Sequence, residues 1–537
     1  MRKKSILGVV LISVFVIGIL GACTPADTPA TPAPPTQTTP AAPTPTPTPA
    51  TPVPPPPPAE AGLGRGITVA IAIETPSVAP ARHTSLVAGF KNALTHNGLF
   101  RSHYTDLSPV PELISGWTAI SDTVFEFELH QGVLFHNGEE LTAYDVIASF
   151  YYVRNYAYAR ANHLSIESWE VVDRYTFRLD TGTPNAMMFF DLTSHANSIM
   201  PRSLIDAGHD FTTTPIGTGP FVFEDWRTGD TLTFRAFEDF YDTDRAARIE
   251  YVQWRIIPEG STRTIALETG EVDYLVDVAF PDVPRLSADP NITVFQRPGN
   301  MMQFFSFNND RPQFQNVYVR RAIDMAFDRE AMVIASLDGF GEPVYSTMPP
   351  MFAGSSQEGT RSFDPDAARA LLAEQGISEG DLEFEMLVFN EEQRRRAEVA
   401  QSNLADIGIA TTISMIDQAA WLTLTTGDNF ETTFANQTQP NLLALMRAIM
   451  HRDSINGPNR ARWDNEELSG LIDQALSTID EGARNAILQE ASRVANEDVG
   501  FIGTNTNVVI RAFNANLVAP EIAPSGAMFL NLVYWVE

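Results

Sequence analysis

The residues of this chain that could take part in catalysis do not fall into a known catalytic spacing. The sequence contains no G-x-S-x-G, no H-E-x-x-H, no G-x-x-x-x-G-K-[ST] and no paired C-x-x-C, the patterns of a serine nucleophile, a zinc site, a phosphate loop and a redox pair. His130 and His136 lie six residues apart around an expected turn, a poor spacing for two metal ligands on one helix face. We therefore expect no enzyme and no metal site. Carboxylates are abundant, so a secreted, surface-anchored hydrolase of peptides or glycans stays open as an alternative.

Charge and lysine content exclude further classes of protein. The 66 acidic and 36 basic residues give a net charge of −30, which repels nucleic-acid phosphates, so no nucleic-acid partner is expected. Beyond residue 4 the only lysine is Lys91, in GFKNAL, which is neither a phosphate-loop nor a Schiff-base context. The glycines of residues 62–66 precede a strand instead of following one, so this segment is interpreted as a linker. We expect no cofactor.

The single cysteine, Cys23, follows a segment typical of secretion. Arg2, Lys3 and Lys4 precede an apolar run of about 15 residues, which is shorter than the roughly 20 residues of a membrane-spanning helix. Residues 20–23 (LGAC) resemble the lipobox of bacterial lipoproteins. This resemblance implies a signal peptide over residues 1–22 and a diacylglycerol on the Cys23 sulfur. The alternative is an uncleaved membrane anchor, and both place the chain outside the cytoplasm, attached to a membrane at the cell surface or in the periplasm.

Residues 23–61 are expected to form a disordered tether. Residues 24–58 contain 16 prolines and otherwise almost only threonine and alanine, too little apolar surface to form a core. Such proline density favours an extended chain that could span on the order of 100 Å. The tether would hold the body away from its lipid anchor.

From about Gly62 the hydrophobic pattern indicates a mixed α/β body. Residues 67–73 are predicted to form a buried strand and residues 124–129 a half-exposed one. Further strands are expected at 176–179, 232–234, 252–257, 384–389 and 411–415. Helix starts are expected where Thr142 precedes Asp145, at Asp364-Pro365 and at Asp328. Helices are predicted over residues 316–327 and about 392–406.

Several blocks in one order carry a resemblance to a family. They are residues 133–138 (VLFHNG) with 141–146 (LTAYDV), 215–221 (PIGTGPF) with Trp226 and Gly229-Asp230, 266–273 (ALETGEVD), and Phe307-Asn308 with 319–323 (VRRAI) and 326–330 (AFDRE). Together they resemble the family 5 extracellular solute-binding proteins of ABC importers, the peptide and nickel-binding group. Taken one at a time, the blocks also suit structural roles: Gly217 and Gly219 a turn, and Arg320 and Arg321 a charged helix face.

The resemblance implies a two-lobed α/β fold with a hinge, of the periplasmic-binding-protein type II, large cluster C kind. Lobe 1 would take residues 62–298 plus 505–537, and lobe 2 residues 299–504. Such a protein captures peptides or similar oligomeric solutes and hands them unchanged to a permease with its ATPase. We expect a monomer. Alternatives within the family are a nickel-complex binder and an oligosaccharide binder.

The resemblance also implies where the ligand binds. In peptide-binding relatives an aspartate of lobe 2 anchors the ligand's amino group, but the matching stretch here is neutral. A neutral amide cannot offset an ammonium charge, so a blocked peptide or an oligosaccharide becomes a better ligand. Trp421 matches an aromatic position near the cleft, although a core position suits it equally. The predicted ligand-binding residues are Asn97, Tyr158, Trp421, Asn436, Gln437, Thr438, Arg447 and His451.

Overall fold

The computed structural model describes residues 63–75, 77–80, 86–156, 166–520 and 522–536, the side chains of residues 86–88 excepted. The chain divides into two units, Met1–Pro57 and Pro58–Glu537. The predicted signal peptide, Cys23 and the tether lie outside the described residues, and so does Tyr158. The second unit is the folded body.

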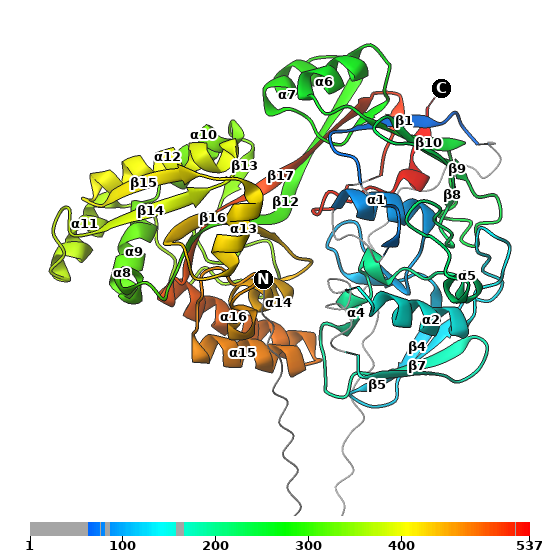
Figure 1. Ribbon diagram of the computed structural model, residues 1–537, viewed down its shortest axis with the longest axis horizontal. Coiled ribbons are helices and arrows are strands. Elements are labelled where there is room, and N and C mark those ends of the chain that lie inside the picture. The colour runs from blue at the N-terminus through cyan, green and yellow to red at the C-terminus, as the bar shows by residue number, and fades with distance from the viewer. Residues whose placement is uncertain (1–62, 76, 81–85, 157–165, 521, 537) are drawn as a thin grey trace, which may run out of the picture. The chain divides into compact units, whose positions relative to one another are not determined.

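A mixed sheet runs through the body (Figure 1). Its strands take the order β15-β14-β16-β12-β17-β11-β1-β10-β9-β8, and β13 pairs with β17 beside this path. β1 is buried over nearly its whole length and pairs in parallel with β10 and β11, which agrees with its continuous apolar run. The bounds are β1 Ile67–Ile71, β8 Phe221–Arg227, β9 Thr231–Ala236, β10 Tyr251–Ile256, β11 Tyr274–Leu275, β12 Ile292–Phe307, β13 Gly341–Pro343, β14 Glu383–Val388, β15 Ala410–Met415, β16 Thr432–Thr438 and β17 Phe501–Asn514.

Two long antiparallel strands, β12 and β17, connect the two halves of this sheet (Figure 1). Residues 292–298 of β12 pair with 508–514 of β17, whereas residues 302–306 pair with 501–506 and also with β16. The register shifts between Pro298 and Met302, and again between Gln303 and Phe304. Because such irregularities bend a strand and increase its twist, both strands can change direction between the two halves.

Hydrophobic clusters divide the body into two lobes. Lobe 1 is built on the clusters around Trp254, Phe127 and Leu275, and lobe 2 on those around Phe305 and Met446. The C-terminal residues of the chain pack into lobe 1. The bounds of lobe 1 (62–298 and 505–537) and lobe 2 (299–504) stay a prediction. The register shifts of β12 begin at Pro298, next to the first of these boundaries.

Lobe 1 contains a further antiparallel sheet of order β4-β5-β7-β6. β5 buries alternate residues, which agrees with its alternating pattern. The predicted start of α2 is confirmed, because the Thr142 N–H and hydroxyl both donate to Asp145 Oδ2, at 2.8 and 2.6 Å. The remaining elements are β2 Phe100–Ser102, β3 Pro109–Pro111, β4 Ile114–Ala119, β5 Val124–Leu129, β6 Ser168–Val171, β7 Thr176–Asp180, β18 Leu517–Val518, β19 Tyr534–Trp535, α1 Leu86–Thr95, α2 Ala143–Val153, α4 Met188–Asp191, α5 Arg202–Asp206, α6 Gly260–Glu268 and α7 Val283–Ser287.

Helices cover the sheet of lobe 2 (Figure 1). The predicted caps are confirmed: the Asp328 carboxylate accepts from the Ala331 N–H and the Asp364 carboxylate from the Ala367 N–H, both at 2.9 Å. The helices are α8 Pro312–Gln315, α9 Val317–Ala326, α10 Arg329–Leu337, α11 Pro365–Glu374, α12 Glu391–Asp406, α13 Gln418–Thr426, α14 Leu442–Ile449, α15 Glu466–Ser477 and α16 Glu481–Asp498.

Of the predicted charged face, Arg321 is half-buried and donates to the Glu497 carbonyl at 2.8 Å, but Arg320 is buried, and so is Arg329 of the AFDRE block. Arg320 is 5% exposed and pairs with Asp498 at 2.6 Å. Arg329 is fully buried, pairs with Asp324, and donates to the carbonyls of Val344 and Gly503 at 2.8 and 2.9 Å. The helical spacing was recognised correctly, but the side chains turn inward and bind partners far along the chain.

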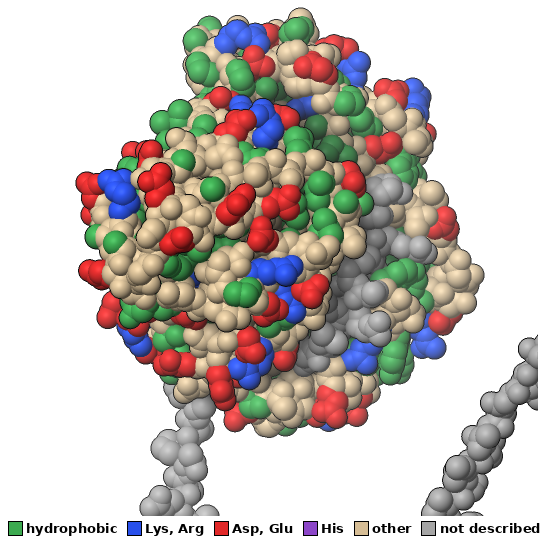
Figure 2. All heavy atoms as spheres, turned by 60° about the vertical axis from the view of Figure 1, so that its left-hand side comes forward, with side chains coloured by type: hydrophobic (Ala, Val, Ile, Leu, Met, Phe, Trp, Pro, Cys, Tyr) green, Lys and Arg blue, Asp and Glu red, His purple; other side chains and the backbone are tan. Residues whose placement is uncertain are grey.

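The surface carries charge of both signs. Figure 2 shows acidic and basic side chains interspersed over the face that it presents. Among the described residues, no helix is both long and apolar enough to cross a membrane.

Candidate functional site

A cavity of about 670 Å³ lies where lobe 1, lobe 2 and the crossing strands meet. Lobe 1 contributes residues of α1 and β2, of segment 187–198 and of segment 524–531. Lobe 2 contributes the end of β16 and the start of α14, and the crossing strands contribute Asn300, Met301 and Asn507. A volume of this order suits a small-molecule ligand that is largely enclosed.

Much of the cavity wall is apolar. Methionine side chains adapt their shape to what they contact, and aromatic rings offer broad apolar faces. The apolar wall can therefore accept ligand groups of different shape. Its members include Phe90, Leu94, Phe100, Leu107, Met187, Phe190, Met301, Met528, Phe529 and Leu530.

Two asparagines connect the parts of the wall. Asn300 donates through Nδ2 to the Gln439 carbonyl at 2.8 Å, and its N–H donates to the Pro524 carbonyl at 3.2 Å. Asn507 Oδ1 accepts from the Met301 N–H at 3.0 Å. A Cβ at Gly299 would overlap the Asn507 side chain, so only glycine permits this close approach. These amides lie at the register shift of β12 and join the lobes there.

One corner of the cavity carries buried charges. Glu112, 8% exposed, accepts from Arg245 at 2.9 Å and from the Gly98 N–H at 3.0 Å. Burial opposes the charge on Arg245, but Glu112, Tyr241 and Asp242 together outweigh burial and raise the pKa of this guanidinium. Arg101, from β2, lines the same cavity. Burial lowers its pKa, and the neighbouring Arg245 charge adds to that effect.

The turn of the PIGTGPF block supports the wall from behind. The Gly219 N–H donates to the Thr95 carbonyl at 3.0 Å, and Thr218 Oγ1 donates to Asn97 Oδ1 at 3.2 Å. A Cβ at Gly217 or Gly219 would overlap residues 94–96 at the end of α1. The glycines therefore let the turn pack directly on the residues that carry His96 into the cavity wall.

Two histidines meet at this turn and are held neutral. Burial, together with the repulsion of the nearby His136, lowers the pKa of His96 to about 3. Burial likewise lowers the pKa of His136 to about 4, although its Nε2 lies 2.9 Å from the Gly219 carbonyl. Both imidazoles stay uncharged at neutral pH.

The two lobes also contact each other beside the cavity. The Ala186 N–H donates to the Leu476 carbonyl of α15 at 2.8 Å. Met187 is 4% exposed and belongs to the hydrophobic cluster of lobe 2 around Met446, against which Phe190 also packs. The segment around the start of α4 thus reaches from lobe 1 to lobe 2 and joins the lobes beside the cavity.

Of the predicted residues on β16, Thr438 lines the cavity. Asn436 lies on the same face of β16 as Thr438, because side chains alternate along a strand. It is exposed, its register partner on β12 is Gln303, and neither residue belongs to the cavity lining. Gln437 is half-buried on the opposite face. The role of Asn436 and Gln437 as ligand contacts stays a prediction.

The other predicted residues lie away from the described lining. Asn97 is buried directly behind the wall, between the lining residues His96 and Gly98. Trp421 packs into the lobe 2 cluster and donates to Thr433 Oγ1 at 2.7 Å. Arg447 is exposed at the end of α14, and the buried His451 follows it, 3.2 Å from Asp473. Ligand binding by these residues stays a prediction.

Several lining residues were not found from the sequence. They are the charged groups Arg101, Glu112 and Arg245 and the amides Asn300 and Asn507. Arg101 lies shortly after the predicted ligand-binding residue Asn97 in the sequence, and this proximity could have indicated it as a further candidate. Nothing local in the sequence connects Arg245 or Asn507 with that region, because only the folded chain brings them together.

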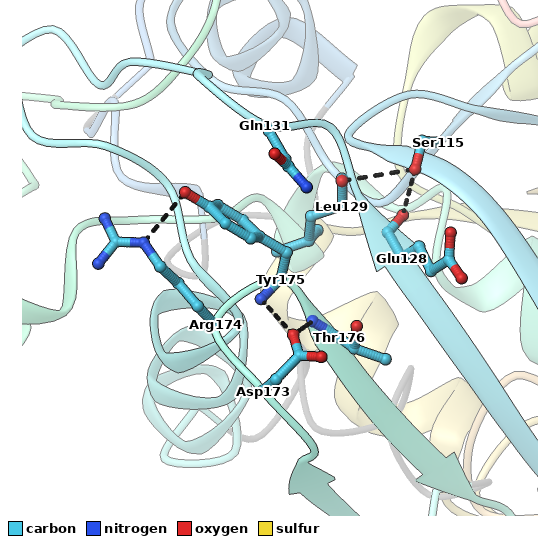
Figure 3. A pocket seen from close by; sticks show the side chains of 8 residues that line it. All are labelled: Ser115, Glu128, Leu129, Gln131, Asp173, Arg174, Tyr175 and Thr176. Carbon is cyan, nitrogen blue, oxygen red and sulfur yellow. Dashed lines mark hydrogen bonds between the residues drawn. The ribbon is translucent and has the colours of Figure 1, made fainter.

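A second hollow, of about 370 Å³, lies at the side of the β4-β5-β7-β6 sheet (Figure 3). Its polar groups largely bind one another. Ser115 Oγ lies 3.2 Å from the Glu128 carbonyl, Asp173 accepts from the N–H of Tyr175, and Arg174 Nε donates to the Tyr175 hydroxyl. We therefore place the candidate ligand site in the cavity between the lobes.

Comparison with known proteins agrees with this geometry. The chain is 26% identical over 442 residues to "Heme-binding protein A" of Haemophilus influenzae, covering 75% of this chain and 79% of that protein. It is 25% identical over 438 residues to "Glutathione-binding protein GsiB" of Salmonella paratyphi A, covering 77% and 83%. The periplasmic binding protein DppA of Helicobacter pylori, solved with the peptide STSA, superposes with a TM-score of 0.76 at 23% identity, covering 88% and 98%.

The predicted two-lobed α/β fold of type II is confirmed by these neighbours. The family model described as "Bacterial extracellular solute-binding proteins, family 5 Middle" matches residues 108–444, which is more than half of the chain. This range includes most of the sequence blocks that suggested the resemblance and both the β12 crossing and β16. The chain therefore belongs to family 5 of the bacterial extracellular solute-binding proteins, which serve ABC importers.

Proposed function

We propose that this protein captures peptides or similar oligomeric solutes outside the cytoplasm and delivers them intact to the permease of an ABC importer. The observation that carries the proposal is the cavity of about 670 Å³ that residues of both lobes line. Closure around a ligand excludes water and strengthens each polar contact, and the ligand's preference for the closed form drives the motion. A binding protein needs this enclosure and no catalytic group.

The chemistry of the wall supports a ligand that is partly apolar and partly polar. Methionine and phenylalanine side chains line it together with amides, hydroxyls and charged groups, a mixture typical of small-molecule sites. Relatives named for binding heme or glutathione, and a structural neighbour holding a peptide, support an organic solute of this size. Thr438 is the proposed lobe 2 contact because it forms part of the wall.

The lobe 2 strand offers no carboxylate for a ligand amino group. Asn436, Gln437 and Thr438 are neutral, and the carboxylates that line the cavity, Glu112 and Asp191, come from lobe 1. Glu112 is already bound to Arg245. A ligand whose amino group is blocked, or an oligosaccharide, therefore stays an alternative to a peptide with a free amino terminus.

The ligand class can be tested with soluble protein that begins near Gly62. We would titrate it by calorimetry with peptides of graded length, glutathione, hemin, oligosaccharides and nickel–histidine. We expect saturable binding of peptide-type ligands, and mass spectrometry should recover the bound ligand intact. Binding restricted to the nickel complex or to sugars would favour the alternatives within the family. Recovery of cleaved ligand would favour the hydrolase.

We also propose that Cys23 anchors the protein through a lipid. The support is the arrangement of basic residues, apolar run and LGAC in residues 1–23. In bacterial cells fed radiolabelled palmitate, the full chain should take up label and Cys23→Ala should not. Equal labelling of both proteins would disprove acylation at this cysteine.

A further inference from the structure

Arg101 projects a charged group into the cavity wall without a protein partner. Its Nε atom is fully enclosed and has no hydrogen-bond partner, and it lines the cavity between the lobes. Within the described parts of the chain, the structure gives its guanidinium neither a hydrogen bond nor an ion pair. The residue as a whole is half-buried, and a partly desolvated charge is costly unless it is paired and hydrogen-bonded, so this side chain needs an explanation.

The carboxylates near Arg101 are occupied elsewhere or act only at a distance. Glu112 holds Arg245 through one oxygen and the Gly98 N–H through the other. Asp242 lies 3.8 Å from Arg245. Asp191, on α4, is a further carboxylate in the wall. Arg245 is thus neutralised by the protein itself, while Arg101 keeps its donors for another acceptor.

The neighbours of Arg101 indicate what else that acceptor must carry. Phe100 precedes it, and Leu107 and Phe529 lie in the same wall. The guanidinium fork matches a carboxylate with two parallel hydrogen bonds, and the surrounding wall suits an apolar group. A neutral sugar would leave the charge unpaired.

We propose that Arg101 is the anion site of the cavity and binds a carboxylate of the ligand, so that the ligands are organic acids with apolar parts, above all peptides with a free carboxylate. This inference rests on the proposed function and makes it more specific. The charge that the ligand brings is negative, and it is held by lobe 1. A net charge of −30 repels anions from the protein as a whole, so a specific positive site is required to hold one.

The test uses the body from Gly62 onward, freed of bound ligand by unfolding and refolding. Its probes are a tryptic digest of casein and the same digest after methyl esterification, which removes the negative charge from every carboxylate. Retained peptides are identified by mass spectrometry. The variants are Arg101→Gln, Arg101→Lys and the control Arg227→Gln, an exposed arginine paired with Asp225.

We expect the unmodified protein to retain peptides from the native digest and to lose them from the esterified one. Affinity for a retained peptide, measured by calorimetry, should fall by about 10- to 100-fold in Arg101→Gln, as expected for loss of hydrogen bonds to a charged group. Arg101→Lys should recover part of it, because it keeps the charge but not the fork. Arg227→Gln should bind as the unmodified protein does.

The outcomes separate this inference from the proposed function. If native and esterified digests are retained equally, and Arg101→Gln binds normally, the anion site is disproved while peptide capture stands. If neither digest is retained, peptide capture fails and the anion site fails with it. The ligand-free Arg101→Gln variant should unfold at the same temperature as the unmodified protein or higher, because it breaks no hydrogen bond. A lower unfolding temperature would assign Arg101 a structural role instead.

Discussion

Lys91 lies in the core of lobe 1, where it is 1% exposed and its ammonium is 5.8 Å from the centre of the Trp254 ring. Burial lowers its pKa from 10.5 to about 8, although the charge of Glu74 partly opposes this. Below pH 8 the ammonium is charged in both the folded and the unfolded chain, so the full cost of burying it is present. Between pH 8 and 10.5 the folded protein loses the proton first, and the cost is relieved.

Lys91→Met should therefore stabilise the protein at neutral pH. We expect the free energy of unfolding to rise by about 3 kcal/mol at pH 7, from the size of the pKa shift. The difference from the unmodified protein should shrink towards pH 10.5. Urea unfolding of both proteins at pH 7 and pH 10 measures this. A difference that does not change with pH would contradict the assigned cause.

His136 and His96 give a pH dependence of the same sign as Lys91, but in the acid range. Their folded pKa values of about 4 and about 3 lie below the ordinary value of 6.5. As the pH falls below 6.5, the unfolded chain takes up protons that the folded protein cannot, and stability is lost. Acid should therefore loosen the turn at Gly217–Gly219, which supports the cavity wall.

Replacing His136 isolates part of this effect. Between pH 6.5 and pH 4 the free energy of unfolding of both proteins should fall. The fall should be about 2 kcal/mol smaller in His136→Gln than in the unmodified protein. At pH 8 the variant should be slightly less stable, because the hydrogen bond to the Gly219 carbonyl changes. Denaturant unfolding at each pH gives both values. Parallel pH profiles would show that His136 does not limit acid stability.

At the scale of elements, the buried pair of Asp324 and Arg329 joins α9 and α10 to the crossing strand β17. Arg329 also donates to the Gly503 carbonyl on β17, and Arg361 approaches Asp324 at 3.4 Å. Removing one partner of a buried pair leaves the other charge uncompensated, which costs far more than breaking an exposed pair. This network therefore fastens two helices to the strand that links the lobes.

Asp324→Asn should destabilise the protein by about 3–5 kcal/mol. The matched control is Asp366→Asn, which breaks an exposed pair with Arg369 one helix turn apart on α11 and should cost less than about 1 kcal/mol. Thermal or urea unfolding of the two variants measures the contrast. Similar losses in both variants would show that burial does not control the strength of the Asp324 pair.

At the scale of the whole molecule, segment 186–190 forms a contact with lobe 2 that we expect to stabilise the closed form. Met187 and Phe190 pack on the lobe 2 cluster, and Ala186 binds Leu476. Hinged lobes open when such contacts separate, and the irregular stretch of β12 is the place where bending is least costly. We expect the ligand-free protein to populate open forms that the ligand closes.

Met187→Glu should hold the lobes apart, because closure would bury a carboxylate in an apolar cluster. Small-angle scattering should show that peptide ligands reduce the radius of gyration of the unmodified protein but not that of Met187→Glu. Ile334→Glu, at a 66% exposed position of lobe 2, should behave as the unmodified protein. If peptide ligands reduce the radius of gyration of Met187→Glu as they do that of the unmodified protein, this contact does not control closure.

Local patterns were sufficient for many elements and for the family. The caps at Asp328 and Asp364 and the burial of β5 depend on neighbours a few residues away, so the sequence alone predicts them. The ordered blocks predicted the family. The inward turn of Arg320 was missed, since its partner Asp498 lies far along the chain.

The sequence by itself therefore determined the α/β elements, their caps and the membership in family 5, because these depend on the short-range periodicity and on the order of motifs. Only the tertiary structure decided which residues form the cavity. Arg101, Arg245 and Asn507 come from distant parts of the chain, and Met187 meets lobe 2 only after the lobes pack. Packing between lobes sets those distances, and no local pattern records them.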